Sequence, residues 1–267
     1  MKIFVWILLF LLVINVIAAL ITVFRKPRSI SSVLAWMMTL IFLPGIGFII
    51  YLFCGRGIDG QEVFKLSDDE KQMVQRIKEK VDVDNKKAGR DKRYDLLYDA
   101  KVLNRYFRNM DASPLAKRNS LQLFTDGQEK FQALFEDIRA AKETVHVEYY
   151  AFFNDTIGNQ FLDVLIEKLH EGVEVYLIYD PWGSPGANKK FFARYVDAGG
   201  KVAPFITSRD MIRKTRLNYH LHRKIVVIDG KIGWTGGFNV GDQYLNVTEK
   251  FGYWRDTHIR LVGTAVF

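Results

Sequence analysis

Hydrophobic residues are strongly concentrated at the N-terminus of this chain. Ile3 to Phe24 forms an uncharged, nearly all-apolar run, and a second uncharged run extends from Ser32 to Cys54. As a helix, each run is long enough to cross a hydrocarbon core of about 30 Å at about 1.5 Å per residue. We therefore expect two retained transmembrane helices, the second kinked at Pro44-Gly45. A cleaved signal peptide is disfavoured, because its apolar core would be shorter and no second span would follow it directly.

Basic residues leave the orientation of these two spans open. Two spans would place the N-terminus and the C-terminal part of the chain on the same side of the membrane. The loop between the runs carries three basic residues, and the flanks nearly balance it with Lys2, Arg56 and Lys65. The excess of positive charge that marks a cytoplasmic loop is therefore too small to assign a side.

The stretch from Gly55 to about Lys117 is polar and highly charged. Ser67-Asp68-Asp69-Glu70 has the pattern of a capping box and predicts a helix through about Val81, with a loop over Asp82 to Arg93. This basic segment either contacts anionic head groups or is a solvated linker.

Beyond Leu121 the pattern alternates between the period of a strand and that of a helix. Strand-like stretches are separated by helical spacing of apolar residues, and Asp180-Pro181 ends one of the strands. This βαβαβ order predicts a layered α/β domain. The expected strands are 121–124, 145–152, 173–179 and 202–206, and the expected helices are 131–138, 161–169 and 189–196.

Charge and cysteine content narrow the classes of partner and site. The net charge is +8, which suits an anionic partner, either nucleic acid or an anionic lipid surface. Charge alone does not choose between them. Cys54 is the sole cysteine, so an intrachain disulfide and a cysteine-based metal site are both excluded.

The residues best suited to catalysis lie in the segment from Tyr219 to Asn239. His222 and Lys224 stand two residues apart, so they share one face of a strand. The strand continues to Ile228 and turns at Asp229-Gly230, as in a hairpin, and a second strand is expected to return over Lys231 to Thr235. An imidazole beside an ammonium suits attack on phosphorus, since the imidazole can act as a nucleophile near neutral pH and the ammonium can neutralise phosphate oxygens.

The same segment resembles the HKD signature of the phospholipase D superfamily. Every element is present, in the order His222-x-Lys224-x4-Asp229-x6-Gly236-Gly237-x-Asn239. A bare His-x-Lys-x4-Asp would be weak evidence. The added Gly-Gly-x-Asn at the correct spacing makes the match specific, against the alternative of a surface strand with a stray histidine.

Within that superfamily the chain most resembles the bacterial cardiolipin synthases, over nearly its whole length. The resemblance implies two transmembrane helices in residues 1–55 and a charged helical linker in 56–118. It also implies one phospholipase D-like α/β/α half-domain with a mixed sheet in 119–267, with the motif region at 217–244. The shorter blocks that carry it are Arg25-x-Pro27, Leu43-Pro44-Gly45-x-Gly47, Tyr51 to Gly55, Asp126-Gly127, His146 to Tyr150, Glu171 to Val175, Asn239 to Tyr244 and Gly252 to His258.

The resemblance also assigns roles. The expected catalytic set is His222, Lys224 and Asp229, with His222 as nucleophile or general acid and Asp229 in a structural role. Lys224 and Asn239 would hold the phosphate, and Gly237 would let the backbone approach it closely.

Two carboxylates complete the expected site. Asp256 occupies the place of a carboxylate that, in the superfamily, bonds the second nitrogen of the catalytic imidazole and fixes its tautomer. Glu148 either faces the same cleft or is a polar residue on an exposed strand face.

The chain departs from the family pattern in having one such motif where the family has two. His146 and His170 lack the following Lys and Asp, and the sequence stops at an apolar run, Gly263 to Phe267. We interpret it as a truncated product or fragment. The alternative is a homodimer in which a twin chain supplies the second motif.

The reaction implied by the resemblance is phosphatidyl transfer, in which two phosphatidylglycerols give cardiolipin and glycerol through a phosphohistidine. The expected location is the bacterial cell membrane, with a multi-pass anchor. No cofactor or metal is implied. The expected partners are anionic phospholipid, the membrane, and a second copy or a full-length synthase. Nucleic acid is not expected, because no basic groove with stacking aromatics can be located.

Two alternatives remain open for the function. The first keeps the chemistry but is a hydrolytic phosphodiesterase of phospholipase D or nuclease type. The second is an inactive half-protein that only binds anionic lipid, and the missing second motif favours it.

Overall fold

The computed structural model describes residues 29–43, 45–55, 67–88, 118–205, 220–247 and 249–266, with isolated positions elsewhere. The first apolar run and most of the linker therefore lie largely outside the described residues. The chain divides into two compact units. The described residues up to Gly55 belong to the first unit and those from Ser67 onwards to the second.

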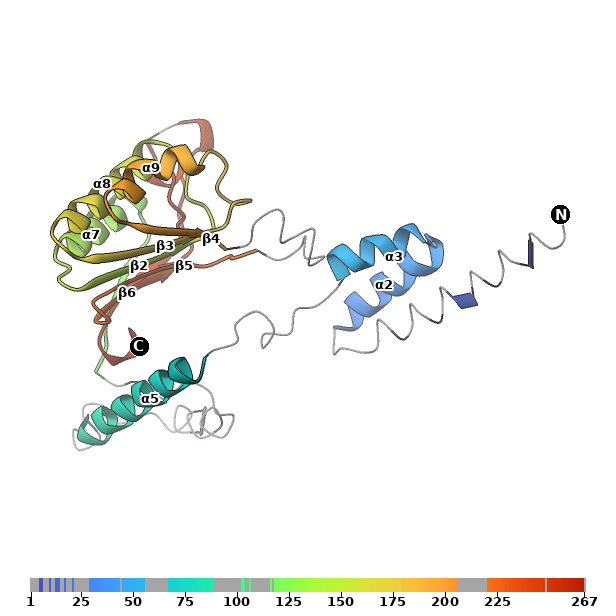
Figure 1. Ribbon diagram of the computed structural model, residues 1–267, viewed down its shortest axis with the longest axis horizontal. Coiled ribbons are helices and arrows are strands. Elements are labelled where there is room, and N and C mark those ends of the chain that lie inside the picture. Colours follow the sequence, from blue (N-terminus) through green and yellow to red (C-terminus); the bar gives the residue numbers. More distant parts are fainter. Residues whose placement is uncertain are drawn as a thin grey trace. The chain divides into compact units, whose positions relative to one another are not determined.

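The first unit contains two short helices that pack against each other (Figure 1). Helix α2 (Ile30–Phe42) is followed by α3 (Ile46–Ile50), which continues into a π-helical turn, η1 (Tyr51–Gly55). The chain reverses at Gly45, whose φ of 81° lies in the left-handed region that favours glycine. The expected kink at Pro44-Gly45 is thus a complete break, and the single helix expected from Ser32 to Cys54 does not form.

Close packing holds this hairpin together. A Cβ on Gly47 would lie 2.5 Å from the carbonyl oxygen of Thr39, so only glycine permits this approach of the two backbones. Leu40 and Tyr51 are buried between the helices, and the ring of Tyr51 meets that of Trp36 edge to face at 5.2 Å.

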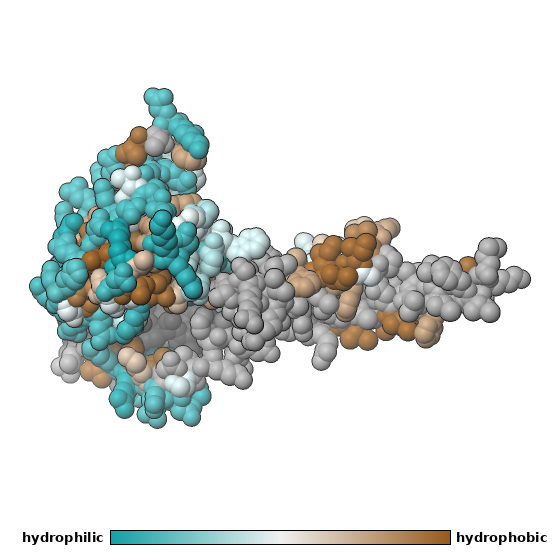
Figure 2. Space-filling view, turned by 45° about the horizontal axis from the view of Figure 1, so that its top comes forward, coloured by the Kyte–Doolittle hydropathy of each residue, from teal (hydrophilic) through white to brown (hydrophobic). Residues whose placement is uncertain are grey.

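The outer surface of the hairpin is apolar. Ile30, Phe42 and Ile46 are 80%, 72% and 63% exposed, and Figure 2 shows this surface in brown. Across the part of the chain that the structure describes, no helix combines the length and the apolar character needed to cross a membrane.

Helix α5 (Asp68–Ala88) begins where the capping box predicts but runs further. The expected loop is therefore wrong for residues 82–88, because this stretch contains neither glycine nor proline to end the helix. Side-chain pairs one turn apart support it, namely Lys71 with Asp68 at 2.8 Å and Gln75 with Glu79 at 3.0 Å.

The core of the second unit is a seven-stranded mixed sheet in the order β1-β7-β6-β5-β2-β3-β4. Strands β2, β3 and β4 run parallel to one another, and the other neighbours are antiparallel. This arrangement confirms the expected mixed α/β class. The strands are β1 (Ser120–Phe124), β2 (Thr144–Tyr149), β3 (Glu174–Tyr179), β4 (Lys201–Pro204), β5 (Lys224–Ile228), β6 (Ile232–Gly236) and β7 (His258–Val262).

Three helices cover one face of this sheet (Figure 1). They are α7 (Gly127–Arg139), α8 (Thr156–His170) and α9 (Lys189–Asp197), and each begins at a capping side chain: Asp126, Asp155 or Asn188. Successive right-handed crossovers from β2 to β3 to β4 put α8 and α9 on the same side. Among the described residues, the second helical layer of the expected α/β/α arrangement is not seen.

Aromatic side chains fill the space between the helices and the sheet. Phe161 is fully buried and lies 5.4–6.4 Å from the rings of Phe131, Phe135, Tyr149 and Phe152, mostly edge to face. This packing fixes the end of β2, which the site uses.

Strand β7 was not expected from the sequence. It lies between β1 and β6, so Phe124 and Gly236 both pair with His258. Three short 3-10 turns complete the fold: η3 (Asp242–Leu245), η4 (Glu249–Phe251) and η5 (Thr264–Val266).

Candidate active site

The end of β2 and the start of β5 bring the signature residues together. These strands are antiparallel, with Tyr149 opposite Lys224, and the ladder continues where the N–H of Tyr150 donates to the carbonyl of Arg223 at 2.9 Å. His222 therefore lies just ahead of β5, at the edge of the sheet where β2 ends.

One aromatic ring connects the two signature bases. The ring of Tyr150 lies 4.6 Å from the imidazole of His222, and the Nζ of Lys224 lies 5.2 Å from the same ring. His222 is exposed, whereas Lys224 is only 4% exposed. Burial lowers the pKa of Lys224, and the Asp256 carboxylate partly opposes this effect. The site thus presents an accessible imidazole beside a partly desolvated ammonium.

Asn239 is fixed at the same end of the sheet. Its Oδ1 accepts from the N–H of Ala151 at 3.1 Å, and its Nδ2 donates to the Tyr244 hydroxyl at 2.7 Å. The loop after β6 also exchanges backbone hydrogen bonds with the end of β2 through Val240. The structure therefore brings Asn239 to the signature bases and holds its amide in one orientation.

Gly237 makes room for Asp256. A Cβ on Gly237 would lie 1.9 Å from Oδ1 of Asp256, so the carboxylate occupies the space of the missing side chain. Asp256 accepts from the N–H of Thr257 at 2.6 Å. Within the described residues no hydrogen bond joins Asp256 to His222. The carboxylate acts here on Lys224, whose charged form it favours.

Asp229 lies at the opposite end of β5 from His222. Its carboxylate accepts from the N–H groups of Lys142, Glu143 and Thr144 at 2.8–2.9 Å. Burial acts to raise the pKa of Asp229, but these three donors outweigh it and the pKa is lowered overall. This geometry fits the expected structural role and places Asp229 away from the bases.

Glu148 is not brought to the signature bases. It pairs with Ile225, so it points to the opposite face of the sheet from Tyr149 and Lys224. Burial raises the pKa of Glu148, against the lowering effect of Arg223. Of the two positions weighed for this residue, the alternation of the strand favours the exposed sheet face.

The structure adds a residue that the sequence analysis passed over. Asp180, 2% exposed, follows β3 and accepts from the N–H groups of Trp182 and Leu221, each at 2.8 Å. It thereby joins the loop after β3 to the segment that carries His222. Asp180-Pro181 was recognised only as the end of a strand, and its partner lies 41 residues away along the chain.

Further basic groups lie beneath the site, on the helix-covered face. Lys130 is fully buried and its Nζ donates to the Tyr149 hydroxyl at 3.0 Å. His258 is also fully buried, and among the described residues neither of its ring nitrogens has a hydrogen-bond partner. Burial, Lys130 and Lys224 together lower the pKa of His258 to about 2. His258 is therefore neutral near pH 7 and adds no positive charge to this end of the sheet.

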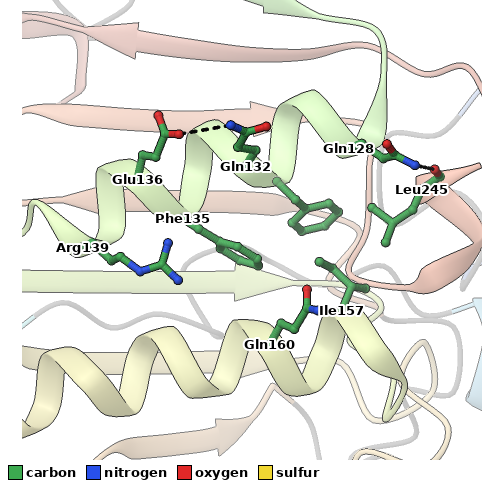
Figure 3. Close-up of a pocket in the computed structure, with 9 residues that line it drawn as sticks. Gln128, Gln132, Phe135, Glu136, Arg139, Ile157, Gln160 and Leu245 are labelled. Atoms are coloured by element: carbon green, nitrogen blue, oxygen red, sulfur yellow. Dashed lines mark hydrogen bonds between the residues drawn. The ribbon is translucent and has the colours of Figure 1, made fainter.

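A separate pocket of about 480 Å³ lies between α7 and α8 (Figure 3). Phe131, Phe135 and Ile157 are among its apolar lining, and Gln128 on its rim donates to the carbonyl of Leu245 at 2.9 Å. None of the signature residues line this pocket, so it is distinct from the candidate active site.

Two family models match this chain, and their descriptions agree with its phospholipase D signature motif. The model described as "Cardiolipin synthase, PLD-like domain" matches residues 134–251, and "Phospholipase_D-nuclease N-terminal" matches residues 13–56. The cardiolipin synthase of Listeria monocytogenes is 41% identical over 273 residues, covering 98% of this chain and 54% of the relative. The major cardiolipin synthase of Bacillus subtilis is 41% identical, covering 95% of this chain and 53% of the relative.

Two solved structures that match part of this chain do so at low sequence identity. NucT from Helicobacter pylori has a TM-score of 0.42 and 19% identity, covering 55% of this chain and 88% of that one. Phosphatidylserine synthase from Haemophilus influenzae has a TM-score of 0.43 and 19% identity, covering 54% of this chain and 33% of that one.

The chain spans about half the length of the curated relatives it matches. Its signature histidine, lysine and asparagine converge at one end of the sheet, within the region that the family model covers. Residues 134–251 therefore belong to the phospholipase D-like domain family of the cardiolipin synthases.

Proposed function

We propose that this chain supplies the nucleophile half of a cardiolipin synthase-type phosphatidyltransferase. The observation that carries the proposal is the convergence of His222, Lys224 and the fixed Asn239 at one end of the sheet. The 41% identity to cardiolipin synthases supports phosphatidylglycerol as donor and acceptor.

The proposed reaction has two displacements at phosphorus. An imidazole nitrogen of His222 attacks the phosphorus of one phosphatidylglycerol, and the bond from phosphorus to the head-group glycerol oxygen breaks. A general acid protonates that oxygen, which releases glycerol. The terminal hydroxyl of a second phosphatidylglycerol then attacks the phosphohistidine and loses its proton to a base. The phosphorus–nitrogen bond breaks, and the product is cardiolipin.

Lys224 would stabilise the negative charge that builds on the non-bridging oxygens in both steps. Its partial burial strengthens this interaction, because charges act more strongly on each other where water is excluded. Asn239 would orient the phosphate, while its own amide is held by Ala151 and Tyr244.

The general acid would come from a second copy of the motif. One imidazole cannot lie on both the nucleophile side and the leaving-group side of a single phosphorus atom, and this sequence has one His-x-Lys-x4-Asp. A second polypeptide that carries the motif is the proposed source.

We also propose that residues 1–55 anchor the chain in the bacterial cell membrane. The apolar exterior of the α2–α3 hairpin supports this, since exposed apolar patches of this kind mark contact with lipid or protein.

The proposal is tested with a substrate that needs no acid, phosphatidyl-p-nitrophenol in detergent micelles. Nitrophenolate leaves without protonation, so this chain alone should release a burst of one equivalent and retain phosphatidate on His222. The His222→Ala variant should show no burst, and His170→Ala, at an exposed helix end, should match the wild type. Absence of a burst in the wild type, or a full burst in His222→Ala, would refute the proposed nucleophile.

A further inference from the structure

We propose that His220, which lies against Asp180, forms a second phosphate-binding subsite beside His222. This subsite would bind the second phosphate of a ligand whose first phosphate lies at His222 and whose two phosphates are joined by one glycerol. This inference rests on the proposed function and deepens it. The ligand class is a bisphosphodiester whose two phosphates are joined by one glycerol, as in cardiolipin.

The first support is the way in which the backbone before β5 is held. Asp180 accepts from the N–H groups of Trp182 and Gly183 at 2.8 and 3.3 Å, and its second oxygen accepts from the N–H of Leu221 at 2.8 Å. Leu221 stands between the two histidines, so a buried carboxylate fixes the backbone from which both side chains project.

The second support is the environment of the His220 ring. Its Nδ1 is buried and lies 3.4 Å from Oδ2 of Asp180, without an aligned hydrogen bond. The side chain is still 27% exposed although Nδ1 is buried, so the exposed area belongs to the other atoms of the side chain. An imidazolium between a carboxylate on one nitrogen and a phosphate oxygen on the other would satisfy both N–H donors.

The third support is that aromatic rings join the two histidines into one surface. The ring of Tyr150 lies 6.4 Å from that of His220 and 4.6 Å from that of His222. The ring of Trp182 also lies near His220, at 5.5 Å, and Trp182 is 57% exposed. This partly apolar wall suits the carbon chain of a glycerol bridge.

The spacing matches the ligand. Two residues of extended chain advance about 6.7 Å. A glycerol linked through its outer oxygens separates two phosphorus atoms by six bonds of about 1.5 Å, hence by about 7 Å when extended. The two phosphorus atoms of such a ligand are therefore about as far apart as the backbone positions of His220 and His222.

Two water-soluble head groups test the subsite on the full chain in detergent. Deacylated phosphatidylglycerol carries one phosphodiester, and deacylated cardiolipin carries two across a glycerol. Calorimetry should show that the wild type binds the second about tenfold more tightly. Inorganic phosphate serves as a third probe, and in a chain labelled with ¹⁵N-histidine it should shift the imidazole signals of His222 more than those of His220.

Substitutions assign that preference to His220. In His220→Gln the ratio of the two affinities should fall to about one, and in His220→Arg, which restores a cation, most of the ratio should return. His146→Gln, on the other sheet face against Tyr176, is the matched control and should keep the wild-type ratio.

The outcomes separate this inference from the proposed function. A wild-type ratio of one, an unchanged ratio in His220→Gln, or a ratio of one in both His220 variants overturns the second subsite. Equal perturbation of His220 and His222 by inorganic phosphate also overturns it, since that result indicates a general anion site. Undiminished binding of the single-phosphate probe to His222→Ala counts instead against the proposed function.

Discussion

At the scale of single residues, the site is a cluster of bases arranged around the ring of Tyr150. His222 is exposed and Lys224 is buried, although they stand two residues apart. The difference arises because β5 begins at Lys224, which turns its side chain toward the helix-covered face, whereas His222 lies beyond the last strand pair. The proposed nucleophile is therefore accessible, while the Lys224 ammonium is partly shielded from water.

We predict that Lys224→Met slows the burst with phosphatidyl-p-nitrophenol by about 100-fold or more, the typical cost of removing one donor to a developing oxyanion. The fold should be retained, because methionine fills a similar volume and no buried ammonium remains to be desolvated. Rapid-mixing kinetics measures the first effect and the thermal midpoint the second. The control is Lys190→Met, on the exposed side of α9. A burst rate within threefold of the wild type would show that Lys224 is not needed.

A second residue-scale prediction concerns His258, whose pKa is lowered to about 2 by burial, Lys130 and Lys224. The folded protein holds this imidazole neutral, whereas the unfolded chain binds a proton below about pH 6.5. Its contribution to stability is therefore complete above pH 6.5. As the pH falls from 6.5 toward 2, it is lost at up to about 1.4 kcal/mol per pH unit.

In the His258→Leu variant, the free energy of unfolding should lack this contribution to its dependence on pH. Urea unfolding at several pH values from 7.5 to 4.5 measures the slope, with His170→Leu as the exposed control. Equal slopes in wild type and His258→Leu would contradict the buried, neutral state of this histidine.

At the scale of elements, the β5–β6 hairpin is the scaffold of the site. Asp229 and Gly230 have φ of 50° and 60°, the left-handed backbone that an Asp-Gly hairpin turn requires. The Asp229 side chain reaches back to three N–H groups at the start of β2, those of Lys142, Glu143 and Thr144. The signature aspartate thus clamps the strand that carries the bases to the strand beside it.

We predict that Asp229→Ala lowers the free energy of unfolding by about 1–3 kcal/mol, because three N–H groups lose their acceptor and alanine tolerates the positive φ poorly. Asp229→Asn keeps an acceptor and the left-handed preference, so it should lose less. Urea unfolding followed by tryptophan fluorescence compares the two. Equal stability of the alanine variant and the wild type would show that the clamp contributes nothing.

At the scale of the whole molecule, the central question is where the second acid comes from. The chain covers 54% of the Listeria monocytogenes relative and carries one signature motif. We predict that residues 1–267 alone bind phosphatidylglycerol micelles without turning over the natural substrate. The specific activity should be measured across a dilution series. Constant activity per chain would refute the half-site proposal, and activity that falls steeply on dilution would identify a dimer as the source.

A second prediction at this scale concerns metals. Once the acid is supplied by a partner, transfer should proceed unchanged in excess EDTA, because in the proposed mechanism Lys224 provides the charge stabilisation that a metal would otherwise provide. Cardiolipin formation is measured before and after chelation. Loss of activity that one particular divalent ion restores would contradict this mechanism.

Local patterns in the sequence predicted most of the helices and strands over the sheet region and the hairpin turn, because these features depend mainly on residues that are close together along the chain. The three helices over the sheet and strands β1 to β6 lie within a few residues of their expected positions. The turn at Asp229-Gly230 and the shared strand end of His222 and Lys224 follow from residue types and from a period of two.

Tertiary structure decided what depends on partners far apart in the sequence. Strand β7 forms because it pairs with β1 and β6. Glu148 faces away from the site because its strand pairs it with Ile225. The hairpin at Gly45 folds back because Gly47 fits against Thr39. Asp180 binds the segment that carries His222 across 41 residues of sequence. A single chain's periodicity cannot show such contacts, since each depends on the packing of two elements whose sequences carry no common signal.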